Sequence, residues 1–467
     1  MINSYKISRR KFIGQASCVA VGGTTFLSSL LNLKAMNAMS INNSSVASCT
    51  DYKALVCLFN SGGLDAFNML LPRTTSEYNM YAATRSNLAL PLNEIRAINA
   101  LNTPGRQFGV HPSMPKIQAL FNSGDVAFIS NIGALVAPIT KEEFYNESVV
   151  APLGLFSHSD QQMHWQTGFS HARAATGWGG RMADLLTSCN SNTNISMAMS
   201  LSGTNLFETG NNSVEFTLSP YGPVGINDDN DGWWYNSLRK NNITNMLDAT
   251  YQNIFEQTYK NITKSARTGN AQITTALTNA PAFTGVFSNS YLSDSFKMVA
   301  KIIASQSSLG MNRQIFFIDY GGWDHHDELL GNQEIMLEEV DNAIGEFHQA
   351  LTSINKLNEV TTFTLSEFNR TLTSNGNGTD HAWGTNVFVM GGAVNGQKIY
   401  GEYPMLQLNG PLEVGGGVMI PTTAAEEYFA ELAMWFGVPN SNLLDLYPNL
   451  GNFYSVGSGN PLGFLTI

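Results

Sequence analysis

Short apolar runs that end abruptly at glycine or polar residues dominate the hydrophobic pattern of the chain. Runs of this length, rich in β-branched and aromatic residues and bounded by turn-forming residues, are typical of buried strands. They occur at residues 54–60, 126–130, 315–319, 360–365 and 387–390. We therefore predict that each of them forms a strand of one central sheet.

Helical spacing of apolar residues is clearest at residues 333–351, which should form a helix that returns the chain to the sheet. Thr423 and Glu426 have the spacing of a capping box, which predicts a second amphipathic helix that continues to Phe436. Weaker helical patterns cover residues 116–122, 237–265 and 290–303. Strands that alternate with helices in this way predict an α/β protein.

The amino terminus has the pattern of an export signal. Arg9 and Arg10 form a twin-arginine pair, and a mildly apolar stretch with glycine and alanine follows them. Small residues near position 40 then give way to polar ones, which favours a cleaved signal over a retained membrane anchor. We predict an export signal at residues 1–40, a linker at 41–52 and a periplasmic or secreted location.

The rest of the chain, residues 53–467, is predicted to be a single domain. The hydrophobic content of the whole chain is 43%, which is enough to bury a large core. Residues 190–300 are rich in Asn, Ser, Thr and Gly and carry no chemical motif. We interpret this segment as an insertion that caps the sheet and shapes a substrate cleft.

Charge excludes one class of partner. The whole chain has a net charge of −11, and loss of residues 1–40 would remove five basic residues and no acidic one, leaving −16. Nucleic-acid binding needs clustered Lys and Arg that contact the phosphates. We therefore expect no nucleic-acid partner.

Cysteine usage leaves little room for thiolate chemistry. Cys57 lies inside an apolar run, where a buried free thiol is expected. Cys49 and Cys189 could form a disulfide, but spacing alone does not decide this. No Cys-x-x-Cys pair occurs, so we do not expect a thiolate zinc site.

Three of the predicted strands are followed by carboxylates or imidazoles. Because ligands in open α/β sheets bind beyond the carboxyl ends of the strands, these side chains should meet in one place. They suit Zn, Mn or Mg as ligands. The alternative is that each is a helix cap or an exposed loop residue. The residues are Asp65 after the first run, Asp324, His325 and His326 after the third, and Glu367, Asp380 and His381 after the fourth.

Residues 157–164 form a second group of reactive side chains, with Ser157, His158, Asp160 and His164 in a short span. A serine before a helical run is commonly a cap. The alternative is that the hydroxyl lies at a helix amino terminus, where free N–H groups stabilise an anion or a phosphoryl group in transfer. The pattern leaves both interpretations open.

Several motifs together resemble a known family, called domain of unknown function 1501, over nearly the whole chain after residue 52. They are Gly-Gly-Leu-Asp-Ala-Phe-Asn at 62–68, Ser-His at 157–158, Gly-Trp-Gly-Gly-Arg at 177–181, Gly-Gly-Trp-Asp-His-His at 321–326, Ser-Glu-Phe-Asn-Arg-Thr at 366–371 and Gly-Thr-Asp-His-Ala-Trp-Gly at 378–384. The chain departs from the family pattern at Trp323, where Phe is usual, at His325, where Thr is usual, and at Leu329, where Gln is usual. Asn369 and Ala382 also replace glycines. The loop around His381 is therefore the least regular part of the match.

That family resembles the alkaline phosphatase and sulfatase superfamily. The resemblance implies a three-layer sandwich with a mostly parallel sheet and a divalent-metal site at the strand ends. It also implies that Ser157 is the nucleophile and that His158 is a ligand or a proton donor. The implied metal ligands are Asp65, Asp324, His326, Glu367, Asp380 and His381.

We predict an exported metal-dependent hydrolase that acts on phosphate or related esters, with a small-molecule or polymeric ester as substrate and the twin-arginine machinery as export partner. Formylglycine sulfatases need Cys or Ser followed by x-Pro-x-Arg, and no such run occurs. A sulfatase of that kind is not expected. The alternative is an envelope binding or matrix protein that kept the fold and lost the chemistry.

Overall fold

The computed structural model describes residues 49–224 and 234–467. The predicted export signal and most of the predicted linker lie outside these residues. The chain divides into two compact units, of which the larger comprises residues 47–226 and 266–467 and the smaller includes residues 227–265. Within the described ranges, no helix combines the length and the apolar character that a membrane span requires.

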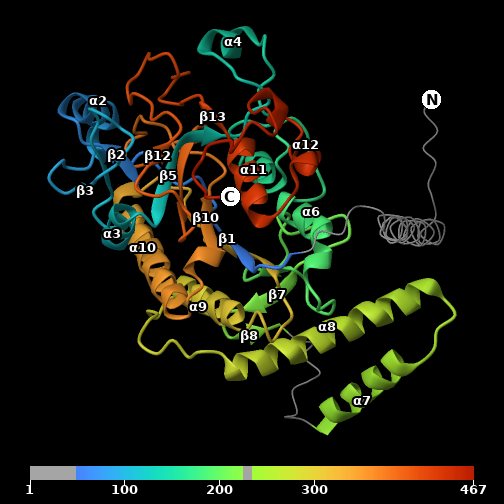
Figure 1. The fold of residues 1–467 in the computed structure, drawn as a ribbon. Coiled ribbons are helices and arrows are strands. Elements are labelled where there is room, and N and C mark those ends of the chain that lie inside the picture. Colours follow the sequence, from blue (N-terminus) through green and yellow to red (C-terminus); the bar gives the residue numbers. More distant parts are fainter. Residues whose placement is uncertain (1–48, 225–233) are drawn as a thin grey trace, which may run out of the picture. The chain divides into compact units, whose positions relative to one another are not determined.

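Three parallel strands form the middle of the sheet in the larger unit (Figure 1): β1 (Lys53–Phe59), β9 (Arg313–Asp319) and β10 (Val360–Leu365). β1 lies between the other two, and both pair with it in parallel. Phe59 is level with Asp319 on one side and with Leu365 on the other. The carboxyl ends of all three strands therefore lie at the same edge of the sheet.

In the described part of the chain the central sheet has ten strands in the order β12-β5-β11-β10-β1-β9-β6-β7-β8, with β13 also pairing with β5. Most pairs are parallel, and the exceptions involve β11 and the β7–β8 hairpin. A separate three-stranded sheet has the order β2-β4-β3. The remaining strands of the central sheet are β5 (Val126–Gly133), β6 (Ala198–Ser200), β7 (Phe216–Ser219), β8 (Gly222–Pro223), β11 (Thr385–Met390), β12 (Ile399–Tyr400) and β13 (Thr423–Ala424). The small sheet consists of β2 (Leu70–Pro72), β3 (Arg96–Ile98) and β4 (Phe108–Val110).

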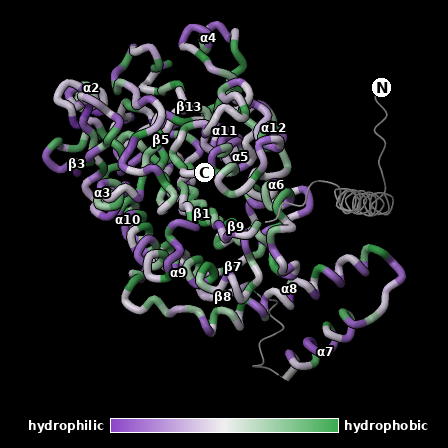
Figure 2. The backbone as a smooth tube through the Cα atoms, in the orientation of Figure 1, coloured by the Kyte–Doolittle hydropathy of each residue, from purple (hydrophilic) through white to green (hydrophobic). Residues whose placement is uncertain are grey.

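Both faces of the central sheet are buried, as the near-continuous apolar sequence of β1 requires. Alternate side chains of this strand enter two different cores, and Figure 2 shows hydrophobic segments around the β1 label. One set is Ala54, Val56 and Leu58, and the other is Leu55, Cys57 and Phe59. The free Cys57 is buried, which confirms the prediction for this thiol.

Helices cover each face, which confirms the predicted α/β fold with a mostly parallel sheet between two helical layers. The first core contains apolar side chains of α3 (Pro115–Ser123), α9 (Tyr291–Ala304) and α10 (Leu329–Ser353). The second contains those of α5 (His158–Thr167), α6 (Trp178–Leu185), α11 (Ala425–Phe436) and α12 (Leu443–Leu446). The other helices are α2 (Thr75–Arg85), α4 (Lys141–Asn146), α7 (Trp234–Asp248) and α8 (Ile254–Asn279).

The segment at residues 190–300, which was predicted as an insertion, contributes strands to the central sheet. β6 and β7 belong to the central sheet, and α9 packs on one face of it. Both strands are too short to give the apolar run on which the prediction depended. The helix predicted at residues 237–265 is two helices, α7 and α8, and of the described part of the segment only residues 234–265 fall in the smaller compact unit.

The predicted capping box at Thr423 is wrong by one residue. Thr423 belongs to β13, and its hydroxyl donates to the Ser130 carbonyl. The helix begins after Ala424, whose backbone N–H donates to Glu427. The carboxyl group of Glu426 is buried instead, where it accepts hydrogen bonds from side chains outside the helix.

Candidate metal centre

The loops that follow β1, β9 and β10 are held together at the carboxyl edge of the sheet. The Gly62 N–H donates to Glu367 Oε1 at 2.8 Å, and the Leu64 N–H donates to Ser366 Oγ at 2.9 Å. Gly62 has a φ of +121°, and a Cβ on it would lie 2.6 Å from the backbone N of Asp324. This position therefore needs glycine both for its backbone angle and for the close approach of the two loops.

Four side chains meet beyond these loops. Nε2 of His158 and Nε2 of His381 each lie 3.4 Å from Asp324 Oδ1, and Nε2 of His326 lies 3.1 Å from the same oxygen. The nitrogens are also close to one another, because His381 Nε2 is 3.0 Å from His158 Nε2 and 3.1 Å from His326 Nε2. The ligand atoms of His158, Asp324 and His381 all fall within 4.8 Å of each other.

Each imidazole has a hydrogen-bond acceptor on its far side. His158 Nδ1 is 2.8 Å from Glu367 Oε1, and His326 Nδ1 is 3.2 Å from Asp380 Oδ1. His381 Nδ1 is 2.8 Å from the Phe156 carbonyl oxygen. Carboxylates and carbonyls only accept, so each Nδ1 carries a proton, and a neutral imidazole then has its lone pair on Nε2.

Three lone pairs that converge at these distances repel one another unless a proton or a cation lies among them. Zinc bound by imidazole at 2.0–2.1 Å would place tetrahedral ligand atoms about 3.3 Å apart. The separations among the ligand atoms of His158, Asp324 and His381 are 3.0 to 3.4 Å, and His326 Nε2 lies 3.1 Å from both Asp324 Oδ1 and His381 Nε2. Imidazoles that bind metal also usually donate their other N–H to a carboxylate or carbonyl, as all three do here. The donor set therefore fits a divalent cation.

The pKa shifts of His381 and Asp324 favour the same arrangement. Partial loss of hydration lowers the pKa of His381, and the positive charge of neighbouring Arg370 contributes to this. Partial desolvation acts to raise the pKa of Asp324, but the hydrogen bond and charge of Arg370 outweigh it and hold that pKa below its usual value. His158 differs, because its hydrogen bond to Glu367 and the charges of Glu367 and Asp324 raise its pKa. His158 is thus the imidazole best placed to take up a proton when no cation is present.

The predicted metal ligands fall into three groups in the structure: some lie in the central cluster, some contact the imidazoles from outside, and one lies apart. Asp324, His326 and His381 lie in the central cluster, and His158 joins them. Glu367 and Asp380 contact the outer nitrogens of two imidazoles. Asp65 is not in the cluster, because its buried carboxylate forms an ion pair with Arg85.

Ser157 occupies the N-cap position of α5, immediately before His158. Its side chain makes no capping hydrogen bond, and its Oγ lies 3.2 Å from Ser159 Oγ. The sequence left two interpretations of this serine open. The structure does not support the first one, in which the hydroxyl only caps the helix. The role of Ser157 as a nucleophile stays a prediction.

Three contributors to the site were not found from the sequence. Arg370, whose side chain is fully buried, donates from Nη1 to Asp324 Oδ1 at 2.7 Å. Gln162 donates to Glu367 Oε1 at 3.0 Å. Phe156 has a φ of +72°, unusual for a non-glycine residue, and offers its carbonyl to His381. Arg370 stood in a recognised motif, but nothing in the sequence reveals a backbone carbonyl as a partner.

The two replacements of family glycines, Asn369 and Ala382, do not disturb the loop around His381. Neither Asn369 nor Ala382 has a positive φ, so glycine is not required at either position. The Asn369 side chain accepts from the Ala66 N–H at 2.8 Å and donates to the Gly384 carbonyl at 3.1 Å. Ala382 is buried, and its N–H bonds to the Asn369 carbonyl.

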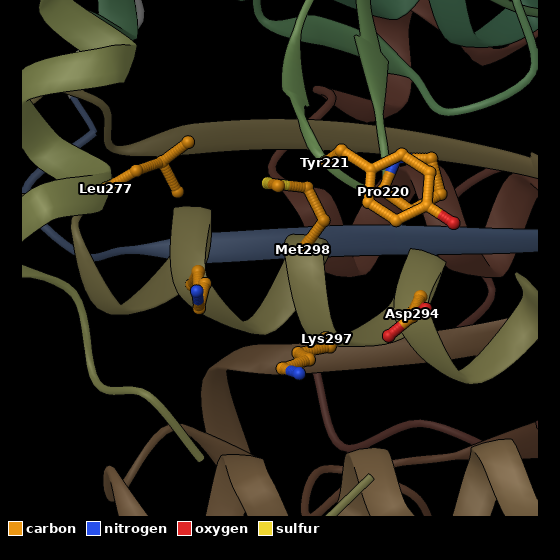
Figure 3. Close-up of a pocket in the computed structure, with 7 residues that line it drawn as sticks. Pro220, Tyr221, Leu277, Asp294, Lys297 and Met298 are labelled. Carbon is orange, nitrogen blue, oxygen red and sulfur yellow. The ribbon is translucent and has the colours of Figure 1, made fainter. Parts of the chain in front are cut away.

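A cavity of about 360 Å³ lies elsewhere, between α9 and the turn that joins β7 and β8 (Figure 3). Tyr221, Lys297 and Met298 are among the residues that line it. None of the predicted site residues does, so this cavity is not part of the candidate metal centre.

The comparisons with known proteins agree with the resemblance seen in the sequence. The family described as "Protein of unknown function (DUF1501)" matches residues 52–414. No curated protein matches the chain. Solved structures that are similar to it include Ps i-CgsB in complex with k-i-k-neocarrahexaose, with 11% identity, coverage of 88% of this chain and 78% of that chain, and a TM-score of 0.35.

Two further structures are similar at comparable levels. The lipoteichoic acid synthase LtaP from Listeria monocytogenes has 10% identity, coverage of 83% of this chain and 80% of that chain, and a TM-score of 0.28. A mutant of TAB5 alkaline phosphatase with Mg bound has 11% identity, coverage of 73% and 91%, and a TM-score of 0.27.

Proposed function

The chain belongs to the DUF1501 family of proteins of unknown function, and from the chemistry of its site we propose that it is an exported metal-dependent hydrolase of phosphate or related esters. The observation that carries this proposal is the convergence of three imidazole lone pairs on one carboxylate oxygen. A stable fold does not need such an arrangement. A cation bound among these atoms would relieve the repulsion between them.

Four residues would hold the metal: His158, His326 and His381 through Nε2, and Asp324 through its carboxylate. Imidazole-rich donor sets suit zinc better than magnesium, which prefers oxygen ligands. A divalent ion in this position supplies positive charge to the oxygens of a phosphoryl group. Glu367, Asp380 and the Phe156 carbonyl fix the ring orientations, and Arg370 holds Asp324 in place and ionised.

Ser157 is the proposed source of the attacking oxygen, with a water molecule in its place as the alternative. It lies between Phe156 and His158 in the chain, and both of these contact the metal cluster, which supports the assignment of Ser157 to the same site. The amino terminus of α5 also begins there, and its free N–H groups stabilise negative charge that develops on a phosphoryl group. In the proposed first step Ser157 Oγ gives up its proton and forms a bond to phosphorus while the bond to the leaving oxygen breaks, and that oxygen takes up a proton to leave as an alcohol. In the second step a water molecule attacks the phosphoserine, which releases phosphate and returns a proton to Ser157 Oγ.

The twin-arginine pair and the apolar stretch after it support export, and with it a periplasmic or secreted location. Proteins exported by this route are already folded when they cross the membrane. The proposed metal would therefore be loaded before transport, and an ester substrate would be met outside the cytoplasm.

Metal analysis combined with an aryl phosphate assay tests the proposal. We expect the purified chain to contain a divalent metal, and we expect hydrolysis that is lost on chelation and restored by adding zinc. A chain with no bound metal and no chelator-sensitive turnover would contradict the proposal and favour a binding protein on the same fold.

Substitution of Ser157 separates the nucleophile from the metal site. We expect Ser157→Ala to lower turnover by a factor of about 10² or more while leaving the metal content unchanged. Ser148→Ala is the matched control, because it removes an exposed serine hydroxyl that takes no part in the site. Equal turnover in both variants would leave water as the attacking group.

A further inference from the structure

The cavity between α9 and the turn that joins β7 and β8 has the size of a small-molecule site. Its volume is about 360 Å³, and all the residues that line it belong to the larger compact unit. Ligand cavities in proteins usually measure roughly 300 to 1,000 Å³, so this one lies at the lower end of the range. It can therefore take a ligand of one or two rings.

One side of α9 forms a wall of the cavity. Asp294, Lys297, Met298 and Lys301 follow one another at intervals of three, one and three residues, which places all four on the same side of the helix. Met298 is buried and gives the wall an apolar floor. The other three side chains are partly buried. The wall therefore combines apolar surface with two ammonium groups and one carboxylate.

The two lysines of this wall are not neutralised by the protein. Among the described residues, neither Lys297 nor Lys301 has an ion pair or a side-chain hydrogen bond. By contrast, Lys53, Lys116 and Lys141 of the same unit each lie 3.5 to 3.9 Å from a carboxylate oxygen. Like charges one helical turn apart repel each other slightly, and an anion between them would relieve this. The pair therefore favours an anionic ligand.

The turn between β7 and β8 presents an aromatic ring to the cavity. Ser219 Oγ donates to the Gly222 carbonyl at 2.9 Å and accepts from the Tyr221 N–H at 3.3 Å, which holds the turn in one shape. Figure 3 shows Tyr221 on one side of the cavity and Asp294 and Lys297 on the other. The Tyr221 side chain is 83% exposed, so its face is available for a ligand to pack on.

We propose that this cavity binds an acidic sugar with a single negative charge, either a uronic acid or a sulfated sugar. Lys297 and Lys301 would hold the acidic group through their charge. The C–H groups of a sugar ring carry small positive charges and would pack on the face of Tyr221, above Met298. Asp294 would accept hydrogen bonds from the sugar hydroxyls.

The charges that line the cavity select this class of ligand. Two lysines and one aspartate sum to +1, which matches one negative charge better than the two charges of a phosphate ester. A simple aromatic anion could also pack on Tyr221, but it has no hydroxyl to donate to Asp294. The proposal is independent of the hydrolase activity, because none of these residues belongs to the candidate metal centre.

Isothermal titration calorimetry of the metal-loaded chain with glucuronate and with glucose 6-sulfate tests the proposal. We expect saturable binding of at least one of them at low salt, and the tighter of the two identifies the acidic group. Lys297→Gln and Lys301→Gln, tested separately, should each raise the dissociation constant by a factor of about 5. Lys398→Gln removes the same charge outside the cavity and should leave the constant unchanged. High salt should weaken the binding.

Tyr221→Ala tests the contribution of the aromatic ring. It should raise the dissociation constant by a factor of about 5, whereas Tyr145→Ala, which removes an exposed ring on α4, should have no effect. Turnover of an aryl phosphate should be the same in all these variants.

Three results would each overturn the proposal. The first is that neither sugar binds saturably. The second is binding that survives the substitutions of Lys297, Lys301 and Tyr221, which would place the sugar elsewhere in the molecule. The third is benzenesulfonate binding more tightly than both sugars, which would assign the cavity to aromatic anions.

Discussion

At the scale of single residues, the proposed centre depends on the acceptors behind its imidazoles, and Asp380 is the one that can be changed with least disturbance. Its side chain is 64% exposed, so its removal leaves no buried gap. We expect Asp380→Ala to lower the affinity for zinc by a factor of about 10 to 100, the usual effect of losing a group that orients a ligand. Competition with a zinc-binding dye measures this.

Asp445→Ala serves as the control for Asp380→Ala, because it removes an exposed carboxylate on α12. It should leave zinc affinity unchanged. A complete loss of metal in Asp380→Ala would show that Asp380 is itself a ligand, as the family resemblance implied.

Glu208 gives a prediction for the pH dependence of stability. Burial raises its pKa to about 8, against the hydrogen bond from Asn205, which lowers it. A raised pKa means that the folded state favours the neutral form. The contribution of Glu208 to the stability of the folded state is fully present below the pKa of the unfolded state and is lost as the pH rises through about 8. Between these values Glu208 should lower the free energy of unfolding by roughly 1 kcal/mol per pH unit.

Urea unfolding of Glu208→Gln at several pH values measures this effect. The amide stays neutral, so the stability of the variant relative to the wild type should increase from pH about 5 to pH about 8. Glu142→Gln, at an exposed position in the first turn of α4, should give no such trend. A constant difference between Glu208→Gln and the wild type would contradict the expectation.

At the scale of elements, the loops that follow β1 and β9 come into close contact at Gly62. We expect Gly62→Ala to destabilise the fold by more than 1 kcal/mol and to weaken metal binding, because its Cβ would meet the backbone of Trp323 and Asp324. Gly105→Ala isolates the cost of the backbone angle. Gly105 has a φ of +78° with open space around it, so its variant should lose only about 1 kcal/mol. Thermal unfolding and metal content measure both effects.

The elements also show what the sequence could and could not predict. The five predicted apolar runs all form strands of the central sheet, because a strand buried on both faces needs a continuous apolar sequence. β6 and β7 were missed because strands of three or four residues leave no such run. The strand ends correctly placed Asp324 and Glu367 at one edge. The sequence pattern could not distinguish metal ligands from the residues that orient those ligands, because His158 and Glu367 come into contact only in the folded chain.

At the scale of the whole molecule, the disulfide between Cys49 and Cys189 joins segments 140 residues apart. It closes a long loop of the unfolded chain, so its removal in Cys49→Ser combined with Cys189→Ser should cost about 2 to 5 kcal/mol of unfolding free energy. The bond is not among the contacts of the metal centre, so the metal content should stay the same. Urea unfolding with and without reductant measures the effect, and the double variant should not respond to reductant.

The central claim concerns one cation and four side chains drawn from α5 and two loops. Anomalous diffraction at the zinc edge, from crystals of the metal-loaded chain, tests it most directly. The account predicts a single strong peak bound by Nε2 of His158, His326 and His381 and by the carboxylate of Asp324. A metal-loaded crystal with no peak among these atoms, or with the ion bound by a different set of residues, would contradict it.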